Sequence, residues 1–172
     1  VAAIKEESVV LDIGTGSGCL AVSVAVHAEE TTIHALDIST AAINVARANA
    51  ERHGVAERII FHEGDARVAL PGTCLFDVIV SNPPYIPSAE IESLQIEVRD
   101  HDPRLALDGG LDGLEFYRSL AVSCLSRLRS DGRLLLEVGD GQGEEVADLI
   151  TAQGGRVLEI LPDLNNIERI VV

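Results

Sequence analysis

Four consecutive residues, Asn82-Pro83-Pro84-Tyr85, could hold a planar amino group for reaction. Because proline has no N–H, the loop offers acceptors and few hydrogen-bond donors, and the residue before a proline favours extended backbone. The Asn82 side-chain oxygen and a backbone carbonyl such as that of Pro83 can then accept both protons of one NH2 group, while Tyr85 stacks on the amide plane or faces a cation. A purely structural Pro-Pro turn fits the bare motif about equally well.

An amino group held in this way is suited to alkylation of its nitrogen. An amide nitrogen is a poor nucleophile because its electron pair is delocalised, as the peptide rotation barrier of roughly 18–20 kcal/mol shows. Holding both N–H bonds out of plane favours the nucleophilic, pyramidal form of the nitrogen. If the alkyl donor is already activated, correct orientation of the two reactants supplies much of the rate. The alkylated nitrogen can lose its proton to water, so no strong base is required. We therefore predict that Asn82, Pro83, Pro84 and Tyr85 are catalytic.

A second candidate site is the glycine-rich loop Gly14-Thr15-Gly16-Ser17-Gly18. Glycines let the backbone turn sharply and approach a ligand closely, although a tight strand-to-helix turn accounts for such a loop equally well. Cys19 stands where the dinucleotide fingerprint GxGxxG/A has glycine or alanine, which disfavours a dinucleotide site. The sequence has no GxxxxGK[ST] phosphate loop, and Ser17 is not in a GxSxG nucleophile elbow.

Two acids and an alanine follow the next two predicted strands. Asp37 can accept two hydrogen bonds from a ribose diol, Asp65 can accept from an adenine amino group, and the Ala66 amide can donate to a ring nitrogen. Each residue alone could belong to an ordinary turn. Their order after successive strands favours a ligand with adenine and ribose but no pyrophosphate, and S-adenosylmethionine is such a ligand.

These residues require a strand-helix alternation to bring them together. We expect an α/β, doubly wound, Rossmann-like fold with a mostly parallel seven-stranded sheet, helices on both faces, and an antiparallel strand near the C-terminus. In such sheets ligands bind beyond the carboxyl ends of the strands. Ser39 should cap a helix that Gly54 ends, and the apolar segment 19–28 should form a buried helix. The expected strands are 8–13, 31–36, 58–62, 76–81, 133–138, 156–161 and 168–172, and the expected helices are 19–28, 40–53, 114–128 and 144–153.

Composition narrows the choice of partner. The 172 residues suggest one domain, and their net charge of -15, with Lys5 as the single lysine, disfavours nucleic acid and suits a basic protein. No apolar run is long enough to span a bilayer. Three widely spaced cysteines without a CxxC pair, and histidines without ligand spacing, predict no metal site and a reduced, cytoplasmic setting.

Three segments, 10–18, 82–85 and 97–118, together resemble the bacterial peptide chain release factor glutamine methyltransferases, which have the class I methyltransferase fold. The resemblance implies methylation of the glutamine in the Gly-Gly-Gln motif of class 1 release factors, with S-adenosylmethionine as cofactor. It implies that 82–85 binds the substrate. The cofactor contacts of the family would match Gly14 to Gly18, Asp37, Ala66 and Asn82.

The resemblance leaves other readings open. The family has an amino-terminal helical domain that these residues do not include, so we expect 1–172 to be the methyltransferase domain alone. A ribosomal-protein glutamine methyltransferase would share the loop, although the stretches 106–110 and 116–118 resemble the release factor enzyme more. An adenine-amino DNA methyltransferase is disfavoured by the acidic charge, and a nucleotide-binding regulatory domain by the intact Asn82 to Tyr85 motif.

Overall fold

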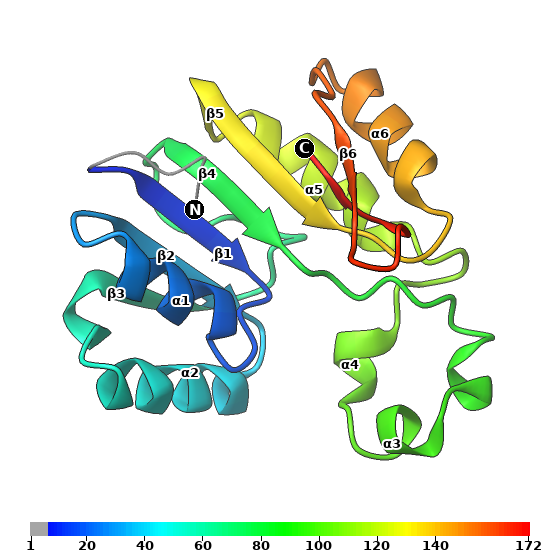
Figure 1. Cartoon of the computed structure of the whole chain (residues 1–172), viewed down its shortest axis with the longest axis horizontal. Helices are drawn as coiled ribbons and strands as arrows, with labels where there is room; N and C mark the ends of the chain where they lie inside the picture. The colour runs from blue at the N-terminus through cyan, green and yellow to red at the C-terminus, as the bar shows by residue number, and fades with distance from the viewer. Residues whose placement is uncertain (1–6) are drawn as a thin grey trace. The chain divides into compact units, whose positions relative to one another are not determined.

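Short apolar and β-branched runs form the strands of a seven-stranded sheet, in the order β3-β2-β1-β4-β5-β7-β6 (Figure 1). The computed structural model describes residues 7–172. The strands are β1 Val9–Ile13, β2 Thr32–Asp37, β3 Ile59–Glu63, β4 Phe76–Ser81, β5 Leu128–Glu137, β6 Ile160–Pro162 and β7 Glu168–Val171. The helices are α1 Cys19–His27, α2 Thr40–Arg52, α3 Ile96–Arg99, α4 Arg104–Leu107, α5 Glu115–Leu125 and α6 Gly143–Ala152, with the 3-10 turns η1 Ala56–Arg58 and η2 Ile91–Ser93.

The chain divides into two compact units. The first contains the described residues up to Asn82 together with Ser123–Leu135, and the second contains Pro83–Val122 and Leu136–Val172. Strand β5 passes from the first unit into the second. The boundary also falls inside the predicted catalytic motif, at the peptide bond between Asn82 and Pro83.

In the first unit, β1 lies between two parallel neighbours. It pairs with β2 on one side and β4 on the other, and β2 pairs in parallel with β3. Chain order runs outward from β1 to β3 and then returns to β4, so the strand order reverses beside β1. This reversal is the position at which open α/β sheets bind ligands. The predicted doubly wound, mostly parallel sheet is therefore confirmed.

Helices α1 and α2 cover one face of this part of the sheet. Ala21, Val22 and Ala25 of α1 and Ala50 of α2 share one apolar cluster with side chains of β1 to β4. The expectation that α1 is buried on all sides is wrong, because Leu20 and Val26 are each 42% exposed. Small alanines let the helix lie close to the sheet, and the sheet covers only the side that faces it.

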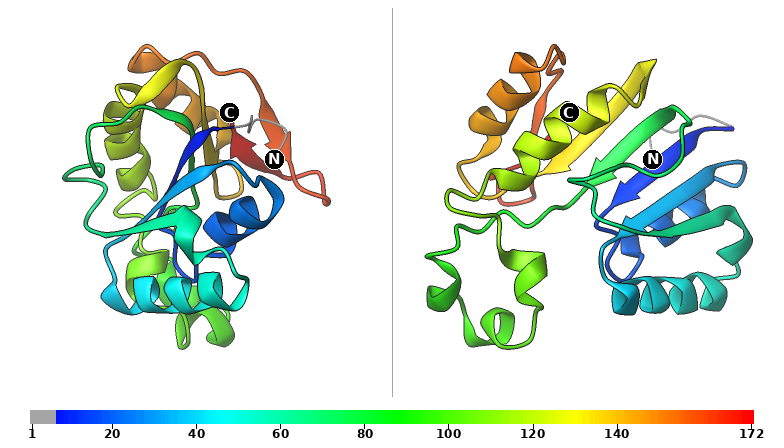
Figure 2. Two further views of the ribbon diagram at one scale, coloured as in Figure 1. Left: turned by 90° about the vertical axis from the view of Figure 1, so that its left-hand side faces the viewer. Right: turned by 180° about the vertical axis from the view of Figure 1, so that it is seen from behind.

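Helix α2 begins and ends as its sequence predicts. The Ser39 hydroxyl accepts a hydrogen bond from the Ala42 N–H at 3.2 Å, which satisfies one of the free amides of the first turn. Ile43, Ala46 and Ala50 are buried at helical spacing. Gly54 follows the helix with φ +69, the left-handed conformation that ends many helices. The connection between β3 and β4, residues 64–75, has turns but no helix (Figure 2).

The second unit contains the antiparallel pairing. Strand β7 runs antiparallel to the end of β5 and to β6, which confirms the predicted antiparallel strand. Helix α6 contacts β7. The buried Tyr117 of α5 donates a hydrogen bond to the Glu137 carbonyl at 2.7 Å, which fixes α5 to the end of β5. The segment between Asn82 and α5 contains η2, α3 and α4.

Two predicted strand boundaries are wrong. Strand β5 begins at Leu128, five residues before the predicted start, because backbone pairing continues through exposed residues such as Arg129 and Ser130. Strand β6 has only the residues Ile160–Pro162, whereas the prediction was 156–161. It lies at the edge of the sheet, where one side has no strand to pair with.

No helix among residues 7–172 has both the length and the apolar character that crossing a bilayer requires. Within the same range, the histidines, cysteines and carboxylates form no group of three that could hold a metal ion.

Thr31→Val should stabilise the protein. The Thr31 side chain is 2% exposed, and its hydroxyl has no hydrogen-bond partner among the described residues. A buried hydroxyl without a partner costs roughly 1–3 kcal/mol, and valine keeps the branched shape without the polar atom. We expect urea denaturation to show an unfolding free energy higher by about 1 kcal/mol. The exposed neighbour gives the control Thr32→Val, which should change it by much less. An unchanged or lower value for Thr31→Val would contradict this explanation.

Candidate functional site

The register of three strands places the predicted residues at one edge of the first unit. Ile13 at the end of β1 is aligned with Leu36 of β2 and with Ser81 of β4. Gly14, Asp37 and Asn82 are the next residues of the three chains. Because these strands are parallel, all three residues leave the sheet at the same edge, beside the reversal of strand order.

The Asp37 carboxylate connects the glycine loop to the start of α2. Its Oδ2 accepts a hydrogen bond from the Gly16 N–H at 2.8 Å, and its Oδ1 accepts one from the Ser39 N–H at 2.9 Å. The N–H groups of Gly14 and Thr15 also bond to the Leu36 carbonyl, at 2.8 and 3.0 Å. A carboxylate has about four acceptor positions, so Asp37 retains capacity for the two hydroxyls of a ribose.

A second carboxylate fixes the loop from inside. Asp12 is 1% exposed, and its Oδ2 accepts hydrogen bonds from the Thr15 hydroxyl at 2.6 Å and the Ala21 N–H at 3.2 Å. Burial raises the pKa of Asp12 from 3.8 to about 6, although these two hydrogen bonds oppose the shift. Sequence reasoning gave Asp12 no role of its own. Its position before the loop was visible, but its contacts with Thr15 and Ala21 were not.

Gly18 ends the loop where two helices approach closely. Its φ is +80, and a Cβ there would lie 2.9 Å from the Ala46 Cβ of α2. Only glycine combines that backbone conformation with the available space. The Ser17 carbonyl accepts a hydrogen bond from the Asn49 side chain at 2.9 Å, which also ties the loop to α2, while the Ser17 residue itself is exposed.

Asp65 and Ala66 follow β3 but differ in their availability to a ligand. The Asp65 carboxylate forms an ion pair with Arg67 at 2.8 Å, and the hydrogen bond from the Arg67 side chain lowers the pKa of Asp65. An adenine amino group would therefore have to share this carboxylate with Arg67. Ala66 is buried, and its N–H has no acceptor among the described residues. The Ala66 N–H therefore has the capacity to donate to a ligand.

Asn82 lies next to the glycine loop within the first unit. The Ser81 hydroxyl donates to the Ile13 carbonyl at 2.9 Å, which holds the ends of β4 and β1 together. The Asn82 carbonyl oxygen would lie 3.8 Å from a Cβ on Gly14. The Asn82 residue is exposed, and its side chain makes no hydrogen bond within the described part of the chain. Its amide oxygen is therefore available to a ligand beside the loop.

Tyr85 is fixed within the second unit by a distant glutamine. Gln142 Nε2 donates to the Tyr85 carbonyl at 3.0 Å, and Gln142 Oε1 accepts from the Gly139 N–H at 2.9 Å. Pro83 is buried, whereas Pro84 and Tyr85 are half-buried. The Tyr85 carbonyl is thus already paired, and sequence reasoning missed this contact because no local pattern links two residues 57 positions apart.

The segment 107–113 supports the other side of the motif. The Ile86 N–H donates to the Leu107 carbonyl at 3.0 Å, and the Gly109 N–H donates to the Ile86 carbonyl at 2.9 Å. A Cβ on Gly109 would lie 2.8 Å from the Tyr85 Cα, so the two backbones touch. These contacts come from the stretch 106–110, which resembles the corresponding part of the release factor glutamine methyltransferases. The stretch therefore supports the backbone of the predicted substrate loop.

The structure brings the predicted residues together in two groups. The first unit holds the glycine loop, Asp37 and Asn82 at one edge, with Asp65 and Ala66 following the neighbouring strand β3. The second unit holds Pro83, Pro84 and Tyr85 on the supports described above.

Comparison with known proteins identifies the class. The family model described as "Methyltransferase small domain" matches residues 1–102, more than half of the chain. The chain therefore belongs to the methyltransferase small domain family. Solved structures agree on the fold: a ribosomal protein L11 methylase from Lactobacillus delbrueckii subsp. bulgaricus superposes with a TM-score of 0.70 at 19% identity, over 99% of this chain and 72% of that one. A TehB-like SAM-dependent methyltransferase from Corynebacterium glutamicum gives a TM-score of 0.64 at 17% identity, over 99% and 80%.

Relatives of higher identity are more specific. The chain is 45% identical to a release factor glutamine methyltransferase from Geobacter sulfurreducens, over 94% of this chain and 56% of the relative. It is 48% identical to a release factor glutamine methyltransferase from Gloeobacter violaceus, over 95% and 57%. The chain thus spans little more than half the length of these relatives.

Asp12→Asn should change how stability depends on pH. A pKa raised from 3.8 to about 6 means that the folded protein holds this proton more tightly than the unfolded chain. The ionised carboxylate therefore destabilises the fold progressively as pH rises from 3.8 to 6, by roughly 3 kcal/mol in full. Asparagine stays neutral, and its oxygen can still accept from Thr15 and Ala21.

We expect the stability gained by Asp12→Asn to grow between pH 4.5 and 7, measured by urea denaturation. The control Asp140→Asn makes the same substitution at an exposed position. A stability difference that stays constant with pH would rule out the buried, proton-binding state of Asp12.

Proposed function

We propose that this chain is the catalytic domain of an S-adenosylmethionine-dependent methyltransferase. Its substrate would be the glutamine of the Gly-Gly-Gln motif in class 1 peptide chain release factors. The identity of 45–48% to release factor glutamine methyltransferases over nearly the whole chain supports this substrate. One observation carries the chemistry: the Asn82 side chain is exposed and has no hydrogen-bond partner in the described chain, and the Asn82 backbone lies beside the glycine loop.

The first unit supplies the cofactor contacts in this proposal. The glycine loop, Gly14 to Gly18, would approach the ligand with its backbone, Asp37 would accept from the ribose hydroxyls, and the Ala66 N–H would donate to the adenine ring. Asp65 would take part only by sharing its carboxylate with Arg67. When bound, S-adenosylmethionine supplies a methyl group already activated on a sulfonium.

The motif would hold the glutamine amide by its two N–H groups. The Asn82 side-chain oxygen and the Pro83 carbonyl are the proposed acceptors, since Gln142 already occupies the Tyr85 carbonyl. The nitrogen electron pair then attacks the methyl carbon, and the N–C bond forms as the S–C bond breaks with its electrons passing to sulfur. One N–H proton leaves to water, so the protein needs to orient the amide but not to deprotonate it.

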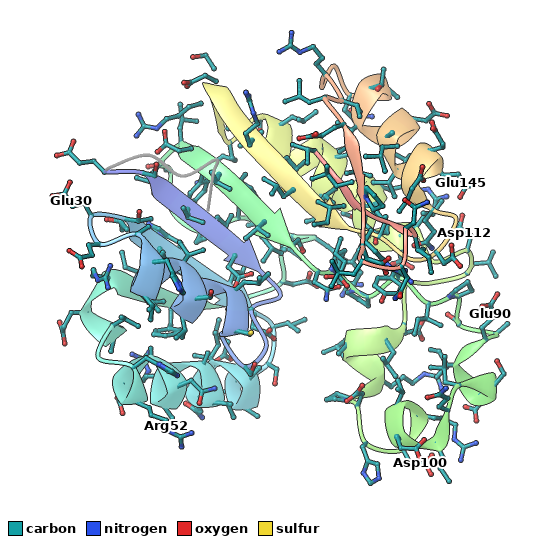
Figure 3. The ribbon with its side chains drawn as sticks, viewed as in Figure 1. Glu30, Arg52, Glu90, Asp100, Asp112 and Glu145 are labelled. Carbon is teal, nitrogen blue, oxygen red and sulfur yellow. The ribbon has the colours of Figure 1, made fainter. Side chains whose placement is uncertain are left out.

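Charge supports a basic protein as the substrate. The second unit has sixteen of the 28 acidic residues but only five of the 13 lysines and arginines. The labelled side chains of Glu90, Asp100, Asp112 and Glu145 extend away from the ribbon (Figure 3). An acidic surface attracts a basic partner and repels nucleic acid phosphates. A release factor substrate would place the reaction in the cytoplasm, in translation termination.

Methyl transfer to a release factor tests the function directly. We expect mass spectrometry to find one added methyl group on the glutamine of the Gly-Gly-Gln motif after incubation with S-adenosylmethionine. Ribosomal protein and DNA, offered separately under the same conditions, should remain unmodified. Transfer to either of them but not to the release factor would replace this proposal with the corresponding substrate class.

Asn82→Ala should remove turnover without removing cofactor binding. The substitution deletes one of the two proposed amide acceptors, and loss of orientation of this kind costs on the order of 100-fold in rate. Calorimetry should show S-adenosylmethionine affinity within a few-fold of wild type. The exposed Asn44 of α2 gives the control Asn44→Ala, which should keep full activity. Wild-type turnover by Asn82→Ala would exclude the assigned role.

A further inference from the structure

Gln142 makes two hydrogen bonds that require opposite chemistry. The Gln142 Nε2 donates a hydrogen bond to the Tyr85 carbonyl at 3.0 Å, and the Gln142 Oε1 accepts one from the Gly139 N–H at 2.9 Å. These partners fix which end of the amide is nitrogen and which is oxygen. Both contacts lie inside the second unit and are partly buried, so the bonds are sheltered from competing water.

Two glycines leave room for this side chain. A Cβ on Gly139 would lie 2.7 Å from Gln142 Oε1, and a Cβ on Gly113 would lie 2.7 Å from Gln142 Nε2. Gly113 also has φ +76, a conformation that other residues adopt at a cost. Two segments of the chain thus approach Tyr85. Gly109 and Gly113 lie against its backbone, while Gly139 lies against its side chain and Gln142 bonds to its carbonyl.

Helix capping does not account for Gln142. The residue directly precedes α6, but its side chain makes no capping bond to that helix. The bond from the Val146 N–H goes to the Gln142 backbone carbonyl, which any residue would provide. The Gln142 side chain therefore bonds to the loop at Tyr85 and not to the first turn of α6.

We propose that Gln142 is a positioning residue for methyl transfer, acting through the Tyr85 carbonyl on the acceptor carbonyl of Pro83. The inference rests on the proposed function. Each proline fixes one backbone dihedral near −65°, so few free rotations separate the anchored Tyr85 carbonyl from Pro83. Anchoring Tyr85 therefore restricts where the Pro83 carbonyl can point, and a misplacement of about 1 Å costs on the order of 100-fold in rate.

Gln142→Glu isolates the donated hydrogen bond. The carboxylate still accepts from the Gly139 N–H but offers no donor to the Tyr85 carbonyl and repels it. We expect kcat for methylation of the release factor to fall 10- to 100-fold at pH 8, with S-adenosylmethionine affinity measured by calorimetry within threefold of wild type. Gln153→Glu adds the same charge at the exposed other end of α6 and should behave as wild type.

The pH profile gives a readout that a general loss of stability would not. Once protonated, the introduced carboxyl can donate to the Tyr85 carbonyl and accept from the Gly139 N–H, as glutamine does. The ratio of kcat for Gln142→Glu to wild-type kcat should therefore rise at least threefold as pH falls from 8 to 5.5. A kcat equal to wild type at pH 8, or a ratio independent of pH, would overturn the inference.

Amide hydrogen exchange separates this inference from the proposed function. Ile86 follows Tyr85 directly, and its N–H bonds to the Leu107 carbonyl. This N–H should exchange at least tenfold faster in Gln142→Glu than in Gln153→Glu. If the wild-type protein methylates none of the substrates, the proposed function fails, and exchange at Ile86 still decides whether Gln142 holds the loop. Unchanged exchange would show that it does not.

Discussion

The alignment of β1 with its two neighbours determines the geometry of the candidate site. Ile13 pairs in register with Leu36 and Ser81, so Gly14, Asp37 and Asn82 leave the sheet together. A shift of one residue in either ladder would turn each side chain of that strand to the other face of the sheet. The apolar cluster between the sheet and helices α1 and α2 opposes such a shift, because a shifted β2 would remove Ile33 and Ala35 from this cluster. Packing of the core therefore sets the position of the chemistry.

Two carboxylates form hydrogen bonds with the glycine loop, and they differ in their burial. Asp12 is buried, and desolvation raises its pKa to about 6, whereas Asp37 is half-buried beside it and bonds to Gly16 and Ser39. The charge of Asp37 contributes to the raised pKa of Asp12. Two ionised carboxylates close together repel each other, which is why the charge of Asp37 adds to the effect of burial on the pKa of Asp12. Asp37 is the carboxylate that we propose meets the ribose of the cofactor.

The parts that could be predicted from the sequence depend on short-range patterns. The carboxyl ends of β1 and β4, the glycine loop and the Ser39 cap are all encoded within a few neighbouring residues, and the order of strands then places Asp37 and Asn82. The exposed face of α1 and the early start of β5 were not predictable, because both depend on which neighbours cover an element. The ion pair between Asp65 and Arg67 joins residues only two positions apart, but the two side chains could each equally have faced solvent. The contact between Gln142 and Tyr85 has no sequence signal at all.

The chemistry of that contact explains why the residue is an amide. Lysine at 142 could donate to the Tyr85 carbonyl but could not accept from the Gly139 N–H, and a carboxylate would do the reverse. Asparagine has both groups but is shorter by one methylene, on a side chain that spans two fixed backbones. Glutamine also adds no charge next to a loop whose proposed substrate is a neutral amide and whose proposed donor is a cation. Glutamine at position 142 would thus support the loop without adding a charge to the proposed reaction.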